Sequence, residues 1–443
     1  MFFCVWEIEM DLIKNDIKTV YRKYLAASLA GSVVMSIYSF IDTISIGQSE
    51  GPVGAASMAV INPLFSVIVF FALLCGVGGA VLYGNARGQG KEEKANAMFT
   101  VAVVLMAAFT VILWLVFGLF HDPILTAFGA DEALLPKVME YAGLIIAFLP
   151  AFTVPIFLGT FIRNDGAPGL AMAAVIIGGC VNMFGDWFFV FPLGMGMRGA
   201  ALATVLGTVV QMLVMCAHFF TKKCTLRLVK PNRIMPAIKQ TLNIGFSSSV
   251  LELGMAVLAI IINNQIMKYG DTNDLAVYGV VATIAALFQA LFGGVGQAIQ
   301  PIVSANCGAG FKDRIRETWR RSMGTVLLMG VVFALIGELF PKAIISLFVE
   351  ATPEVLAAAP GVMRPYFVMF VFAGVNVLAT YHMQSILHGN VAIFTAIMRG
   401  VVLSGTLVLI MPLFLDILGV WTALPVADAI ICAFNLWYIY KRT

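Results

Sequence analysis

Long apolar stretches recur along the whole chain, and short polar segments separate them. Each stretch is long enough to cross a hydrocarbon core of about 30 Å as a helix. Spans two and eight are unusually long and hold glycine clusters at 76–79 and 293–296, so we expect them to tilt or bend there. The pattern predicts an all-α membrane protein with twelve transmembrane helices, at residues 24–48, 54–86, 97–119, 135–162, 168–191, 199–220, 242–267, 275–306, 318–340, 356–386, 390–412 and 418–440.

The composition indicates a surface that faces lipid. Sixty per cent of the 443 residues are apolar and 12% are charged, whereas soluble domains carry about 25% charged residues. The net charge of +3 is too small for a nucleic-acid-binding protein, and the basic residues do not form one patch. The seven cysteines are scattered and the four histidines lack metal-ligand spacing, so we expect neither a disulfide framework nor a metal site from them.

Lysine and arginine are distributed unevenly between the two ends of the predicted spans. Twenty-two of the 27 lie on the side of the N-terminus, and five lie on the other side, namely Lys137, Arg198, Lys268, Lys342 and Arg364. Because basic loops stay in the cytoplasm, we expect both termini there, with the chain in the inner membrane of a bacterial cell. Residues 221–240 form a basic linker that we expect in the cytoplasm. The same rule explains its positive charge, so a lipid- or nucleotide-binding patch is not needed to explain it.

The two halves of the chain share features at one constant offset in the numbering. Residues 88–90, Gly-Gln-Gly, fall on residues 308–310, Gly-Ala-Gly, and charged residues follow both segments. At the same offset, Pro192 falls on Pro412. We therefore expect two parallel six-helix repeats, an N-terminal lobe at 1–220 and a C-terminal lobe at 241–443. Such a duplication normally places a substrate path between the lobes, which rock to give alternating access.

Polar residues inside the predicted spans of the N-terminal lobe fall at one depth. A carboxylate at the bilayer centre costs about 3 kcal/mol, so Asp42 and Asp186 need a physical reason. Asn182 lies one turn from Asp186 on the same face, and Thr204 lies at the same depth in the next span. The four residues predict either a Na⁺ site of oxygen ligands or a pair of carboxylates that share a proton. The alternative is a structural polar cluster that only bridges helices.

In the C-terminal lobe the embedded carboxylates are Glu252 and Asp428, both near the middle of their spans. Neutral polar residues of the same lobe accompany them, among them Gln265 and Gln289. We treat all four as candidates for substrate or proton binding, since Glu252 could attract a cation. For Asp428, a hydrogen bond between packed helices is an equal alternative.

Signatures of enzymes are missing from the sequence. It contains no HExxH, no GxSxG and no Walker A motif. The single GxGxxG, at Gly194, Gly196 and Gly199, falls in a predicted loop between two spans and not after a strand. We therefore expect no catalytic residues and no cofactor.

Several segments resemble the multidrug and toxic compound extrusion (MATE) transporter family. Residues 41–48, IDTISIGQ, resemble its DT-x-x-x-G opening, and residues 161–168, FIRNDGAP, are similar to a stretch of its MepA-like and DinF-like bacterial branch. The spacing Asn182-x-x-x-Asp186 occurs in the same branch, and Glu252 matches a glutamate of span seven. Leu424, Pro425, Val426, Ala427 and Asp428 resemble the motif of the last helix. The resemblance covers nearly the whole chain.

The resemblance implies secondary active efflux of small organic cations in exchange for H⁺ or Na⁺. It implies that Asp42, Asn182, Asp186 and Thr204 couple the ion, with Na⁺ bound at these four if sodium is used. We expect the protein to be a monomer that contacts membrane lipids. We expect it to bind no nucleic acid. The sequence departs from the family at Leu251, where many relatives carry a basic residue, and at residues 382–390, which leaves the cargo of the C-terminal lobe open.

Three other functions compete with cation efflux. A flippase for lipid-linked oligosaccharides would need a cationic cavity for anionic head groups, and we expect Arg364 and Arg399 only toward the ends of spans. A membrane-embedded lipid-modifying enzyme would need a nucleophile or a metal site. A passive channel fits poorly with two duplicated lobes.

Overall fold

The computed structural model describes residues 11–231, 234–348 and 352–442, which are almost entirely helical and contain no strand. The N-terminal bundle holds α1 (Ile17–Gly88), α2 (Glu92–Leu119), α3 (His121–Ala127), α4 (Leu135–Ala147), α5 (Leu149–Asn164), α6 (Pro168–Gly185), the π-helix η2 (Asp186–Val190), α7 (Gly196–Cys216) and the short η3 (Ala217–Phe220). The C-terminal bundle holds α8 (Ile234–Tyr269), α9 (Thr272–Ala309), α10 (Lys312–Leu339), α11 (Pro341–Phe348), α12 (Pro353–Phe367), α13 (Met369–Ser385), α14 (Gly389–Ile397), the π-helix η4 (Met398–Val402), α15 (Leu403–Ile410) and α16 (Pro412–Arg442).

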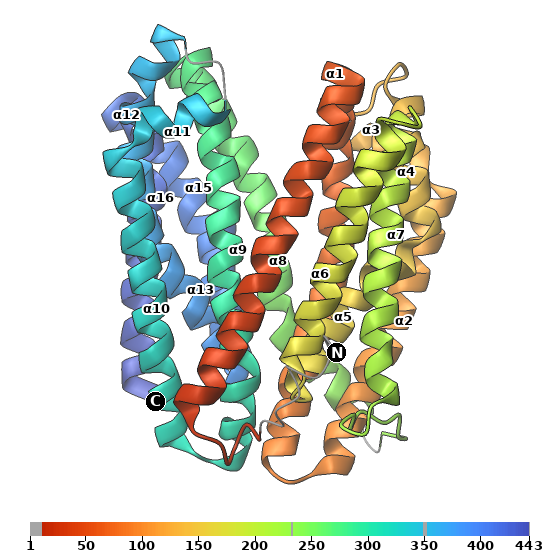
Figure 1. Ribbon diagram of the computed structural model, residues 1–443. Coiled ribbons are helices and arrows are strands. Elements are labelled where there is room, and N and C mark those ends of the chain that lie inside the picture. Colours follow the sequence, from red (N-terminus) through yellow and green to blue (C-terminus); the bar gives the residue numbers. More distant parts are fainter. Residues whose placement is uncertain (1–10, 232–233, 349–351, 443) are drawn as a thin grey trace.

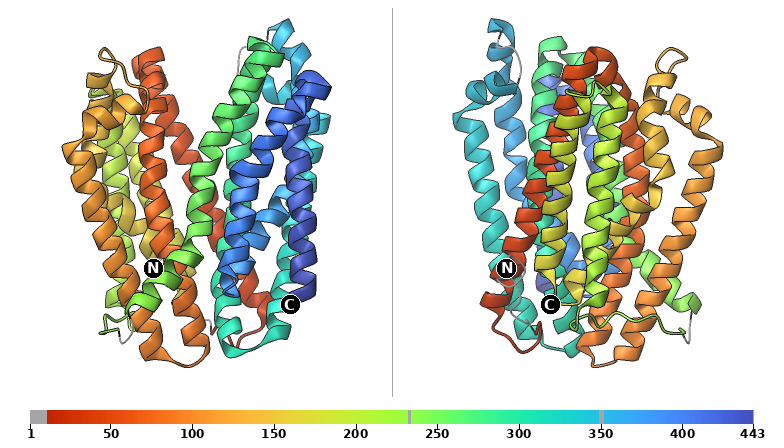
Figure 2. Two further views of the ribbon diagram at one scale, coloured as in Figure 1. Left: turned by 180° about the vertical axis from the view of Figure 1, so that it is seen from behind. Right: turned by 45° about the vertical axis from the view of Figure 1, so that its right-hand side comes forward.

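The two bundles stand side by side and diverge toward one end (Figure 1). They meet at the end that carries residues 88–92 and 308–312, and they part toward the end that carries the labels α1 and α11 in Figure 1 (Figures 1 and 2). We call these the contact end and the open end. The first half of α1 crosses between the bundles, since it starts beside α10 and ends in the N-terminal bundle (Figure 1). At its start, the Tyr21 hydroxyl donates to Thr325 of α10 at 2.8 Å.

Eleven helical segments of the described residues are long and apolar enough to cross a membrane. The count is twelve if α4 and α5, which are bent by 56° at their junction, form one span. The prediction of an all-α membrane fold with about twelve helices is therefore confirmed. The pattern of apolar residues missed α3 and α11, because helices of seven and eight residues are too short to cross a bilayer.

The helices run beyond the predicted spans, because the apolar pattern locates the bilayer and not the caps. For example, α1 begins at Ile17, where the Asp16 side chain accepts a hydrogen bond from the Thr19 amide. The chain reverses at Gly51, whose φ of 60° and ψ of −144° suit only glycine. Gly51 is the sole residue with non-helical angles inside α1, so the backbone stays helical through 76–79 and shows no local break there. The described backbone of α9 likewise keeps helical angles through 293–296. The tilt that we gave as the other expectation stays a prediction.

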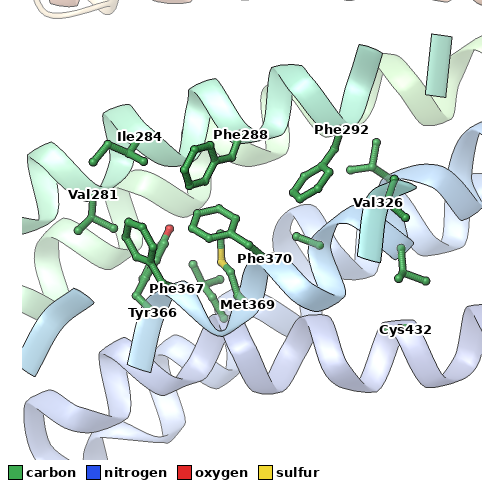
Figure 3. Close-up of a cluster of buried hydrophobic side chains, with 14 of the residues drawn as sticks. Val281, Ile284, Phe288, Phe292, Val326, Tyr366, Phe367, Met369, Phe370 and Cys432 are labelled. Atoms are coloured by element: carbon green, nitrogen blue, oxygen red, sulfur yellow. The ribbon is translucent and has the colours of Figure 1, made fainter. Parts of the chain in front are cut away.

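The core of the C-terminal bundle is a group of interlocking aromatic rings from α9, α12 and α13 (Figure 3). Phe370 of α13 meets Phe288 of α9 edge-on, with ring centroids 4.9 Å apart. Phe370 also meets Phe367 edge-on at 5.1 Å. Edge-to-face pairs of this kind stabilise a core beyond the burial of their area. These contacts pack α9 against α13 in the core of the bundle.

Asp416, near the start of α16, occupies a backbone conformation that glycine normally takes. Its φ is 48° and its ψ is −139°, and Gly196, the equivalent position in the first repeat, has a φ of 52°. We expect Asp416→Gly to raise the free energy of unfolding by about 1 kcal/mol over Asp416→Ala, since only glycine relieves the strain. Thermal unfolding of the two purified variants in detergent measures this difference. Equal melting temperatures would show that the strain is absent.

Candidate ion-coupling site

Two glycines let α6 and α7 approach closely enough for their polar side chains to meet. A Cβ atom on Gly207 of α7 would lie 2.7 Å from the carbonyl oxygen of Gly178 and 2.8 Å from Cβ of Asn182. Real Cβ atoms do not come this close, so both positions require glycine. At this crossing the Asn182 amide donates a hydrogen bond to the Thr204 hydroxyl at 3.3 Å.

Asp42 of α1 contacts the Thr204 hydroxyl of this pair. One carboxylate oxygen accepts a hydrogen bond from the Tyr141 hydroxyl of α4 at 3.2 Å, and the other lies 3.4 Å from the Thr204 hydroxyl. Asp42 is 8% exposed and Thr204 is 9% exposed. Tyr141 was not among the residues predicted for this site, because a tyrosine within an apolar span cannot be told from a packing residue until its neighbours are known.

Asp186 completes the cluster and has no hydrogen-bond partner among the described residues. It is the first residue of the π-helix η2 and is fully buried. Both of its carboxylate oxygens, and Oδ1 of Asn182, lack a donor in the described part of the chain. Asp186 nevertheless lies close enough to Asp42 for the two carboxylates to interact electrostatically. An isolated buried charge of this kind is so unfavourable that a proton or a cation must neutralise it.

The structure thus brings Asp42, Asn182, Asp186 and Thr204 together and adds Tyr141. Helical segments of one bundle supply these side chains, and η2 places Asp186 where a π-helix widens the helical turn. Such π-helical turns occur frequently at functional sites. Three oxygen atoms of the cluster, both carboxylate oxygens of Asp186 and Oδ1 of Asn182, accept no hydrogen bond from the described residues. Such free oxygen acceptors are suited to bind a proton or a small hard cation.

The C-terminal bundle has a different arrangement at Asp428. Its carboxylate accepts a hydrogen bond from the Arg399 guanidinium at 2.7 Å and another from the Asn376 amide at 2.9 Å. Arg399 also donates to Gln289 at 3.2 Å, so two of the predicted candidates share this arginine. Arg399 and Asp428 are both buried. The placement of Arg399 toward a span end is therefore wrong, since the π-helix η4 holds it inside the bundle.

Glu252 and Gln265 do not join the Asp428 cluster. Both lie on α8, 13 residues or about 20 Å apart along the helix. Glu252 is exposed and lies seven residues after Gly245, so both occupy the same face of α8. A Cβ atom on Gly245 would lie 2.7 Å from the carbonyl carbon of Leu74 in the N-terminal bundle. Glu252 therefore lies on the face of α8 that is directed toward the other bundle.

A further buried carboxylate, Asp165, lies at the contact end between α5 and α6. It accepts hydrogen bonds from Arg87 at 2.8 Å, from Tyr83 and His218 at 2.7 Å, and from the amide of Thr225 at 3.0 Å. Burial alone would raise the pKa of Asp165, but the hydrogen bonds from His218, Thr225 and Tyr83 outweigh it and hold the pKa below its usual value. This network fixes the segment after α7 to the rest of the N-terminal bundle.

The same network places three metal-ligand types together. Asp165, His218 and Cys224 have ligand atoms within 4.8 Å of one another, although 53 residues separate Asp165 from His218. The sequence spacing gave no sign of this cluster. Each oxygen of Asp165 already accepts several hydrogen bonds, one of them from a cation, so we interpret the cluster as a structural network.

We expect Asp165→Asn to lower the free energy of unfolding by about 3 kcal/mol at neutral pH, because Arg87 loses its charged partner. Asp131→Asn is the matched control, since Asp131 is exposed and its change should stay within about 0.5 kcal/mol. Because the pKa of Asp165 is lowered, the stabilisation is full above about pH 4 and disappears as acid protonates the folded protein. Unfolding curves of wild type and variant that stay equally far apart below that pH would contradict the assignment.

Comparison with known proteins decides the family. The MatE family model matches the chain twice, over residues 27–188 and 248–410, once in each bundle. The chain belongs to the MATE transporter family. The resemblance noted in the sequence is thereby confirmed, and this MATE chain is a multi-pass membrane protein of a family of transporters, which are not enzymes.

Curated relatives and solved structures agree with this assignment. The chain is 24% identical to the probable multidrug resistance protein YoeA of Bacillus subtilis, over 94% of this chain and 93% of the relative. It is 22% identical to the multidrug export protein MepA of Staphylococcus haemolyticus, over 93% and 90% of the two chains. A multidrug resistance MATE transporter solved in an outward-facing conformation superposes with a TM-score of 0.91 at 21% identity, covering 98% of both chains.

A further solved structure shares this fold, although a different function is suggested for it. It is a transporter of the MOP superfamily from Pyrococcus furiosus, described as having a binding pocket of reverse polarity that suggests a different function. It superposes with a TM-score of 0.90 at 21% identity over 98% of both chains. The charged residues of each chain therefore have to be located before its function is inferred from this fold.

Proposed function

We propose that this chain exports small organic cations across a bacterial inner membrane in exchange for H⁺ or Na⁺. The observation that carries the proposal is the buried Asp42–Asp186 cluster, whose unpartnered oxygens need a proton or a cation. The curated relatives YoeA and MepA, described as multidrug resistance and export proteins, support the efflux of varied compounds.

We place the contact end in the cytoplasm. Without Arg399, which η4 holds inside the bundle, 21 of the 27 basic residues lie on that side of the predicted spans, and basic loops stay in the cytoplasm. Both termini are then cytoplasmic, and the open end faces outward. The similarity to a transporter solved in an outward-facing conformation supports the same assignment.

The coupling ion enters from the open end and neutralises Asp42 and Asp186. Because the ion binds one arrangement of the lobes more tightly than the other, its binding shifts the equilibrium between them. The cargo meets the C-terminal lobe at Glu252, which is exposed on the interlobe face of α8 and offers a negative charge. Ion and cargo then occupy different lobes and exclude each other through the lobe arrangement.

Arg399 does not support an anionic lipid as cargo. The flippase alternative needs free cations in the cavity, but Asp428 neutralises Arg399 at 2.7 Å. The carboxylates Asp42, Asp186 and Glu252 would instead repel an anionic head group.

Ethidium export from inside-out vesicles or proteoliposomes tests the proposal. We expect an imposed H⁺ gradient or an imposed Na⁺ gradient to drive ethidium accumulation, and an assay in Na⁺-free buffer separates the two ions. Liposomes without protein are the control. Ethidium movement that ignores both gradients, or an ion conductance without exchange, would contradict the proposal and favour a channel.

A further inference from the structure

The two lobes touch through glycines at the contact end. A Cβ atom on Gly88 of α1 would overlap the carbonyl group of Ala305 in α9, 2.8 Å from its carbon. A Cβ atom on Gly308 of α9 would overlap the carbonyl group of Asn85 in α1 at the same distance. Positions 85 and 88 correspond to positions 305 and 308 at the constant offset between the repeats. The contact is therefore reciprocal, with each repeat inserting its glycine against the backbone of the other.

A second reciprocal contact joins α1 to α8. A Cβ atom on Gly78 would lie 2.9 Å from the carbonyl carbon of Thr241, and one on Gly245 would lie 2.7 Å from that of Leu74. We call Gly78, Gly88, Gly245 and Gly308 the glycine seam. At all four positions the obstructing atoms belong to the backbone of the opposite lobe, so no side-chain rotation can make room for a methyl group.

A buried polar contact between the lobes accompanies the glycine seam. The hydroxyl of Ser304 in α9 donates a hydrogen bond to Asn164 of α5 across the lobes at 3.2 Å, and both residues are buried. Most other tightly packed glycines of the protein contact their own lobe, as Gly207 does with Gly178. Contacts within one lobe persist when the lobes rock as rigid bodies. The contacts of the glycine seam exist only while the contact end is closed.

We propose that the glycine seam lets the contact end of the transporter close, and that it forms in only one of the two lobe arrangements. Alanine is a better helix former than glycine, so a methyl group at Gly88 or Gly308 favours each isolated helix. The same methyl group is incompatible with the closed contact end, because the backbones could not approach as they do here. Alanine therefore shifts the lobe equilibrium toward the arrangement in which this end is parted. This inference rests on the rocking of the lobes that is part of the proposed function. It does not depend on which ion or which cargo is transported.

Distances between spin labels in nanodiscs test the closure. In a background without the seven native cysteines, one label pair at Lys91→Cys and Lys312→Cys reports on the contact end, where both residues are exposed. A second pair at Asp131→Cys and Asp271→Cys reports on exposed positions of the open end. We expect Gly88→Ala and Gly308→Ala each to enrich the long-distance population of the first pair roughly tenfold.

The second label pair and a matched glycine make the result specific. The open-end pair should move closer in the same variants, since rocking parts one end and closes the other. Gly293→Ala lies on the same helix as Gly308 but has no atom within 4 Å of its added Cβ, so its distances should match wild type. Unchanged distances in both seam variants would overturn the proposal. A loss of defined distances at both ends would overturn it too, because the methyl group would then disrupt the fold and not the closure.

Discussion

Asp186→Asn is expected to abolish ion-driven export while leaving the protein folded. Asparagine preserves the volume of the side chain but cannot be ionised, so it neither releases a proton nor supplies a charge for Na⁺. Because Asp186 is fully buried and has no donor among the described residues, the neutral variant should be at least as stable as wild type. Export under an imposed gradient and the melting temperature measure the two effects separately.

Asp42→Asn should abolish coupling in the same way, and Tyr141→Phe should weaken it by about tenfold. The tyrosine donates to Asp42 at 3.2 Å, and a hydrogen bond to a charged group contributes about 1.5–3 kcal/mol. Asp131→Asn, an exposed change in the same lobe, should export at the wild-type rate. Full coupled export by both Asp42→Asn and Asp186→Asn would show that the cluster only bridges helices.

Asp428→Asn is expected to destabilise the protein by about 3–5 kcal/mol. The change leaves the buried Arg399 without its carboxylate, and an uncompensated buried charge is strongly unfavourable. The double variant Arg399→Met/Asp428→Leu removes both charges, so it should recover most of the lost stability. Unfolding in detergent measures both variants.

The same double variant distinguishes the two lobes in function. If the Arg399–Asp428 pair is structural, the double variant should keep ion-driven export within a few-fold of wild type. An Asp428→Asn variant as stable as wild type, or a folded double variant that has lost coupling, would contradict this assignment. The pair would then belong to the coupling machinery.

The grouping of the four candidate residues in the N-terminal lobe was predictable from their positions along the predicted helices. The i, i+4 spacing of Asn182 and Asp186 puts them on one face, and counting residues from span ends puts Asp42 and Thr204 at their depth. Tyr141 was not predictable, since its role depends on which helix packs beside Asp42. The orphaned oxygens of Asp186 were also invisible in the sequence, because they depend on the positions of all neighbouring donors.

In the C-terminal lobe, the partner of the embedded carboxylate could not be predicted from the sequence. An embedded carboxylate such as Asp428 demands a partner, but the pattern could not identify Arg399 in a different helix. The constant offset between the repeats did predict that Gly88 and Gly308 are equivalent. It could not reveal that each packs against the backbone beside the other, because that contact depends on the relative position of the lobes.

Direct ion binding to the purified protein tests the central claim that the Asp42–Asp186 cluster holds the coupling ion. Proton uptake during a titration between about pH 5 and 8, and Na⁺ uptake at fixed pH, are measured without any cargo. We predict a saturable uptake of one of the two ions in wild type and in Arg399→Met/Asp428→Leu, and its loss in Asp42→Asn and Asp186→Asn. Uptake that remains at the wild-type level in both aspartate variants would contradict the account.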